Sequence, residues 1–112
     1  EDISNIKNDL ERLTGKTTTL LYKSDNIVKV MVAHKMSGKF IDLSGRQRML
    51  SQRMGLFVER YLRTDNEDDY LQFIKAKNLY NETINMFINN ADIKAIPEVY
   101  VEIEKTYKYW EA

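Results

Sequence analysis

The chain of 112 residues is long enough for one domain with its own core. Lysine plus arginine and aspartate plus glutamate number 17 each, and this zero net charge argues against a nucleic-acid partner, which would need a basic surplus. The sequence has no cysteine, which excludes disulfides and thiolate metal sites, and its single histidine argues against histidine-based metal sites and catalytic triads. The four glycines and single proline, among many strong helix formers, favour an all-α protein.

Apolar residues that step by three and four predict a first helix over residues 2–36. His34 closes this seam and is expected in the core at the end of the bundle. Gly38 is a plausible C-cap after this helix, although residues 34–45 can also continue as one helix, because the stepping can be carried through Gly38, Ile41 and Gly45. The seam consists of Ile3, Ile6, Leu10, Leu13, Thr17, Leu20, Ser24, Ile27, Met31 and His34.

Three further helices follow, over residues 40–63, 65–90 and 97–111. Thr64 and Glu67 have the spacing of a capping box, which predicts that Thr64 caps the third helix. Pro97 suits the first turn of the fourth. The second helix has its own core seam of Leu43, Gln47, Leu50, Met54, Phe57 and Tyr61.

Four amphipathic helices with short connections predict an antiparallel four-helix bundle that forms a single domain over residues 1–112. The first helix is expected to be about twice as long as the fourth. An even number of helices places both termini at one end, which is typical of a sensor domain between two membrane spans. No segment has the pattern of a signal peptide or a span. Since the sequence begins with Glu1, we expect a piece of a longer chain, with the fourth helix continuing.

A second seam on the second helix predicts a binding site. Gly45, Arg48, Gln52, Gly55 and Glu59 also step by three and four, roughly opposite the core seam, and two glycines in a row of this kind suggest a close partner helix. If that helix belongs to a second subunit, two-fold symmetry brings Arg48 toward its own copy. A shared oxyanion would remove the repulsion between the two guanidinium groups and accept their paired donors. Gly45 would leave room for the anion, and Gln52 would add a hydrogen bond.

Other polar and aromatic residues have simpler interpretations. Arg46, Arg53 and Arg60 recur every seven residues beside the core seam, where a charged row is usually structural. The acidic residues 65–69 suit a helix N-terminus, and the tyrosines with Trp110 suit an aromatic core. No nucleophile–base pair or phosphate loop is evident, so we expect neither an enzyme nor a cofactor.

Residues 43–54, LSGRQRMLSQRM, closely resemble the signature of the PilJ-type sensor domain, the N-terminal domain of type IV pili methyl-accepting chemotaxis transducers. The same run is similar to the ligand box of nitrate/nitrite sensor histidine kinases. The resemblance implies that Gly45 and Arg48 hold a small anion at a homodimer interface, and Ser44, Arg46 and Gln52 are the neighbouring candidates for ligand binding. Asp42 replaces the asparagine usual in the family, and Arg46 is the expected partner for this carboxylate.

The resemblance further implies a periplasmic sensor domain of a chemoreceptor or sensor kinase in the inner membrane, anchored by flanking transmembrane helices and binding nitrate, nitrite or a similar oxyanion. Two alternatives stay open. In the first alternative, the bundle is a structural or protein-interaction module that uses the second seam for dimerisation. In the second, it binds a small organic ligand within one subunit, near Tyr80 and Tyr107.

Overall fold

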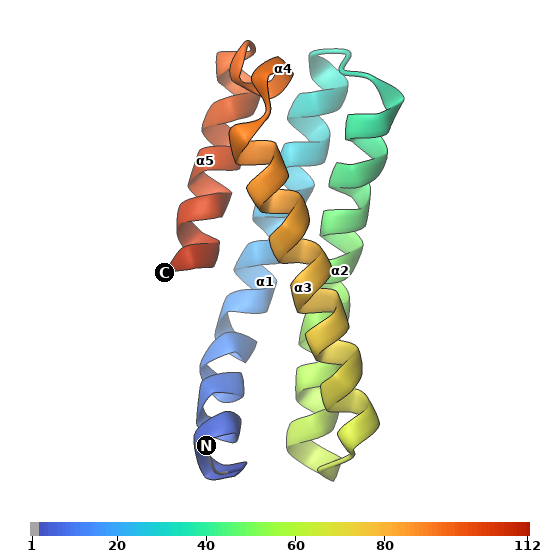
Figure 1. The fold of residues 1–112 in the computed structure, drawn as a ribbon, viewed down its shortest axis with the longest axis vertical. Helices are drawn as coiled ribbons and strands as arrows, with labels where there is room; N and C mark the ends of the chain where they lie inside the picture. Colours follow the sequence, from blue (N-terminus) through green and yellow to red (C-terminus); the bar gives the residue numbers. More distant parts are fainter. Residues whose placement is uncertain (1–2) are drawn as a thin grey trace.

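The computed structural model describes the backbone of residues 3–112 and the side chains of residues 5–112. The long helices run up, down, up and down in an antiparallel bundle that measures 44 × 23 × 19 Å (Figure 1). The predicted all-α bundle with four main helices is confirmed. The helices are α1 (Ile3–Ala33), α2 (Gly38–Thr64), α3 (Glu67–Asn89), the short α4 (Ala91–Lys94), which the sequence pattern did not predict, and α5 (Pro97–Glu111).

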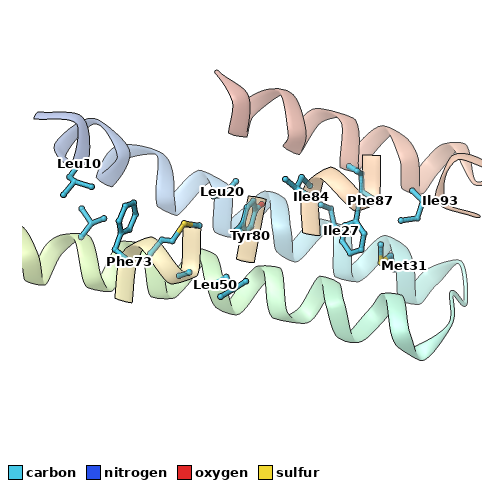
Figure 2. Close-up of a cluster of buried hydrophobic side chains, with 14 of the residues drawn as sticks. Leu10, Leu20, Ile27, Met31, Leu50, Phe73, Tyr80, Ile84, Phe87 and Ile93 are labelled. Atoms are coloured by element: carbon cyan, nitrogen blue, oxygen red, sulfur yellow. The ribbon is translucent and has the colours of Figure 1, made fainter. Parts of the chain in front are cut away.

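The core is one continuous cluster along the bundle axis, to which each long helix contributes a stripe with helical spacing (Figure 2). The seam predicted for α1 is confirmed from Leu10 to Met31, with Leu13 half-buried. The side chain of Ile3 lies outside the described residues. The fully buried apolar side chains include Leu20, Ile27, Met31, Met54, Val58, Tyr80, Ile84, Phe87, Ile93, Val99 and Ile103.

The chain turns between α1 and α2, which settles whether one helix continues through this region. Lys35 takes the left-handed conformation with φ 54°. Its N–H donates to Val32 O at 3.0 Å, and the N–H of Met36 donates to Met31 O at 3.0 Å. These two bonds satisfy the last carbonyl groups of α1. The prediction that Gly38 caps α1 is therefore wrong, because Lys35 has this role and Gly38 begins α2.

His34 is exposed, so its predicted place in the core is also wrong. The physical reason is that α1 ends at Ala33: the N–H of His34 still donates to Val30 O at 3.0 Å, but the chain turns at Lys35 and leaves the His34 side chain exposed.

The connection from α2 to α3 also differs from the prediction. Thr64 is the last residue of α2, and its hydroxyl donates to Arg60 O at 2.8 Å. The N-cap of α3 is Asn66, whose side chain accepts from the N–H of Asp68 at 2.8 Å. The prediction of a capping box at Thr64 is therefore wrong, since the chain reverses at Asp65 with φ 57°. The expected acidic first turn of α3 is confirmed.

The lengths of α1 and α5 differ as predicted, with 31 and 15 residues. The helix α5 begins at Pro97 and covers only one half of α1 (Figure 1). Lys16 Nζ donates to Ala112 O at 2.6 Å, so the last residue lies beside the middle of α1. Within residues 3–112, no helix is both long enough and apolar enough to cross a membrane.

Candidate functional site

The motif of residues 42–55 lies within the unbroken helix α2, which presents it to three different surroundings. One side is buried in the bundle core, one side lies against α1 and the rest faces outward. Gln47, Leu50, Ser51 and Met54 are buried, whereas Arg48, Met49 and Gln52 are exposed. A helix turns by about 100° per residue, so neighbours in the motif point into different surroundings.

Two of the five predicted ligand residues are engaged within the bundle. Ser44 is fully buried, and its hydroxyl donates to Ile41 O at 2.8 Å. Arg46 is half-buried and donates from Nη2 to Thr83 Oγ1 of α3 at 2.8 Å. Arg46 therefore bonds to α3, and within the described part of the chain it forms no ion pair with Asp42. These contacts engage the Ser44 hydroxyl and one nitrogen of Arg46, whereas the buried Nε of Arg46 has no hydrogen-bond partner among the described residues.

Gln47, which the core seam predicts inside the bundle, makes a hydrogen bond across it. Its Nε2 donates to Tyr80 O at 3.0 Å, while its buried Oε1 has no hydrogen-bond partner among the described residues. The hydroxyl of Tyr80 lies 3.0 Å from that of Ser24, and Ser24 lies 3.2 Å from Ser51. A polar layer thus joins α1, α2 and α3 beneath the outward face of the motif.

Arg48 lies on the side of α2 that borders α1. Its Nε donates to Asp25 Oδ1 at 3.1 Å, and the other carboxylate oxygen of Asp25 lies 3.1 Å from Lys29 Nζ. The hydrogen bond from Lys29 lowers the pKa of Asp25, and the charges of Lys29 and Arg48 add to this effect against the opposing effect of desolvation. Asp25 is therefore ionised at neutral pH and faces two cations. The side chain of Arg48 remains 49 % exposed.

Sequence reasoning missed Asp25 because it is far from the motif in the chain. The available signal was the antiparallel register of the first two helices, which also brings Ser24 to Ser51 and Thr17 to Gly55. That register depends on the length of the turn, which the sequence left open.

The two glycines of the second seam have different surroundings. A Cβ atom built on Gly55 would lie 3.1 Å from Thr17 Oγ1 and 3.4 Å from Thr17 Cβ, so the close partner helix at Gly55 is α1 of the same chain. The sequence pattern suggested a close partner helix and left its origin open, and at Gly55 that helix comes from the same subunit. A Cβ built on Gly45 would meet nothing within 4 Å. Gly45 thus leaves open space about one turn from Arg48 and about two turns from the exposed Gln52 on the same side of α2.

Three apolar side chains are exposed on α1 and α2. Met49 is 39 % exposed and Leu56 is 45 % exposed, and they share one side of α2 because they are seven residues apart. Tyr22 of α1 is 68 % exposed and lies three residues before Asp25. Singly exposed apolar residues are ordinary.

A second hollow lies on another side of the bundle, where α5 ends against α1 and α3. It has a volume of about 430 Å³, and the rings of Tyr109 and Trp110 form part of its wall together with Lys16, Lys77 and Asn81. Trp110 Nε1 donates to Asn81 Oδ1 at 2.9 Å. Tyr80 lies in the core behind Trp110, with 4.7 Å between the ring centroids, and is fully buried. Burial raises the pKa of Tyr80 to about 12 although its hydrogen bonds to serines lower it.

The structure therefore brings Gly45, Arg48 and Gln52 together on or beside the outward side of α2 and adds Asp25 to them. Across residues 3–112, no cluster of three or more histidine, cysteine, aspartate or glutamate side chains is arranged to hold a metal ion. No protein-family model, curated protein or solved structure matches this chain.

Proposed function

We propose that this chain is the ligand-binding sensor domain of a bacterial transmembrane receptor and binds a small oxyanion, such as nitrate or nitrite, where two copies of α2 meet. Arg48 supplies the positive charge, Gly45 the space and Gln52 a further hydrogen bond. The proposal includes a periplasmic location, flanking membrane anchors and a binding role without catalysis. The output is that of a chemoreceptor or a sensor kinase, as the resemblance of residues 43–54 implies.

The observation that carries the proposal is the open space beside Gly45. An alanine or larger residue in a helix interior is more stable than glycine by roughly 0.5–1 kcal/mol. Gly55 avoids a close contact with Thr17, whereas a Cβ atom at Gly45 would have no neighbour within 4 Å among the described residues. A ligand or a partner helix outside the chain would account for this glycine.

Arg48 fits the role of the anion's partner in its position and its chemistry. Half of its side chain is exposed, and the contact to Asp25 uses one N–H at Nε. Guanidinium has five N–H donors in a planar fork that suits oxyanions. The remaining donors can therefore reach outward. The exposed apolar residues Tyr22, Met49 and Leu56 would bury their surface in the same dimer interface.

The test is calorimetric titration of nitrate, nitrite, sulfate and acetate into the wild type, Arg48→Ala and Arg53→Ala. Arg53 is the matched control, because it has the same charge, the same helix and an exposed position. We expect nitrate or nitrite to bind the wild type and Arg53→Ala, and binding to be lost in Arg48→Ala. Equal binding by Arg48→Ala refutes the assignment. High protein concentration is needed, because a site shared by two chains forms only in the dimer.

The hollow beside Trp110 supports a second candidate, a small organic ligand bound within one subunit. The two aromatic rings and Lys77 would suit a compound with a ring and a carboxylate, although Lys16 donates to Ala112 O and Glu111 adds a negative charge to the same lining. Tyr80 is not free to contact such a ligand, because it is fully buried and bonded to Ser24. Binding of an aromatic carboxylate such as benzoate that is lost in Trp110→Ala and kept in Arg48→Ala would favour this candidate over the oxyanion site.

A further inference from the structure

Asp25 forms a hydrogen-bonded ion pair with Arg48, the arginine on which the proposed anion site depends. A carboxylate and a small oxyanion are the same kind of acceptor for a guanidinium group. In the structure, Asp25 Oδ1 accepts from Arg48 Nε at 3.1 Å, across the boundary between α1 and α2. An anion that binds Arg48 must therefore either share this arginine with a negative neighbour or displace that neighbour.

The contact has the features of a pair that can exchange. Its hydrogen bond uses Nε of Arg48 and one oxygen of Asp25, so it lacks the two parallel bonds of the strongest arginine–carboxylate pairs. The side chains of Arg48 and Asp25 are 49 % and 33 % exposed, and solvent screens ion pairs at such positions. Lys29 Nζ stays 3.1 Å from the other oxygen of Asp25, so the carboxylate keeps a cationic partner when Arg48 leaves.

We propose that Asp25 is an internal counter-anion of the site: it holds Arg48 against α1 in the empty protein and releases it when an oxyanion binds. This inference depends on the proposed function and assigns a residue that regulates the same site. Asp25 acts through Arg48 and does not touch the ligand, so it is a positioning residue that sets the affinity.

The exchange also connects binding to movement. A ligand shifts a conformational equilibrium only by its difference in affinity for the two states. The Arg48–Asp25 pair joins α1 to α2 at the level of the motif, and a second pair between Lys7 and Asp65 lies near the other end of these helices. Binding of the anion would remove the Arg48–Asp25 pair, while the hydrogen bond between Ser24 and Ser51 and the Lys7–Asp65 pair would still join the two helices. The loss of the Arg48–Asp25 pair would lower the cost of a small shift of α2 against α1 near the site, and small helix shifts at subunit interfaces are a known means of signalling.

The test compares nitrate affinity by calorimetry at constant ionic strength in the wild type, Asp25→Asn, Asp25→Glu and Glu59→Gln. Asp25→Asn keeps the shape and removes the competing charge, so we expect affinity to rise about two- to fivefold. Asp25→Glu keeps the carboxylate and should stay within about twofold of the wild type. Glu59→Gln removes the same charge from an exposed position on α2 away from Arg48, and should change affinity by less than about twofold.

A second measurement follows the exchange itself, through the NMR signal of the Arg48 Nε–H group. Without nitrate, the signal should differ between the wild type and Asp25→Asn, because only the wild type has the carboxylate acceptor. At saturation with nitrate, the two signals should converge. Unchanged or weaker binding by Asp25→Asn, or signals that stay apart at saturation, overturns the role of Asp25 while the anion site stands. Nitrate binding by neither protein overturns the proposed function and this inference together.

Discussion

Replacement of Gly45 by alanine should raise stability and abolish anion binding. The new methyl group would meet no atom of the chain within 4 Å, so it adds no clash to the folded subunit. Alanine is favoured over glycine in a helix interior by about 0.8–1.0 kcal/mol. The free energy of unfolding should rise by that amount, whereas the volume that the proposed anion needs would be filled.

The change in melting temperature follows from the size of the chain. An unfolding entropy of about 2.1 cal/mol/K per residue gives about 0.24 kcal/mol/K for 112 residues, so about 1 kcal/mol corresponds to a rise of about 4 °C. Differential scanning calorimetry without ligand measures this rise, and nitrate titration measures the loss of binding. Gly15→Ala is the matched control, because Gly15 is an exposed glycine inside α1 with nothing within 4 Å of a built Cβ.

Both alanine variants should therefore melt higher than the wild type, and only Gly45→Ala should lose nitrate binding. If Gly45→Ala binds nitrate as well as Gly15→Ala does, Gly45 does not make room for the ligand. A lower melting temperature for Gly45→Ala would contradict the open space beside this residue.

Three further substitutions test other parts of the structure. Lys35→Gly should stabilise the protein by about 1 kcal/mol in urea unfolding, because Lys35 has φ 54° and glycine lacks the Cβ that opposes this conformation. Lys35→Ala keeps a Cβ and should show no comparable gain, and equal gains for the two variants would refute the reasoning. Gln47→Met should raise the melting temperature, because removal of the unpartnered Oε1 stabilises the fold by more than the lost hydrogen bond to Tyr80 O destabilises it, for a net gain of about 1 kcal/mol. A lower melting temperature would contradict this reasoning. Tyr80 has its pKa raised from 10.0 to about 12 in the folded protein, so the folded state keeps a proton that the unfolded chain loses. Stability should be retained below about pH 10 and fall toward pH 12 by up to about 1.4 kcal/mol per pH unit, and Tyr80→Phe should reduce this fall in urea unfolding.

The errors in the predicted fold lie at helix ends and in the connection from α3 to α5, where the short α4 was not expected. Thr64 and Gly38 have residue types suited to caps, yet Asn66 and Lys35 perform these roles. A cap depends on where the chain must reverse so that the next helix packs in register. Local preferences of about 1 kcal/mol are easily outweighed by burial of a core seam. The exposed His34 has the same origin, since it is the first residue of the turn that follows α1.

The candidate site was predicted in part. The step from Gly45 to Arg48 and Gln52 is a property of helical periodicity, so the sequence was enough to place these residues together. Asp25 and Thr17 were not predictable in this way, because they approach α2 only through the packing of α1. The same packing gave Gly55 an intramolecular partner and turned Arg46 toward Thr83.

The sequence by itself determined the helices, their buried seams and the residues that share one side of the motif, because these depend on the regular turn of a single helix. The tertiary structure alone decided which neighbour each side meets, because contacts between helices depend on the register set by turns and core packing. For this protein, that register brings the carboxylate of Asp25 to the guanidinium of Arg48 and leaves the space beside Gly45 open.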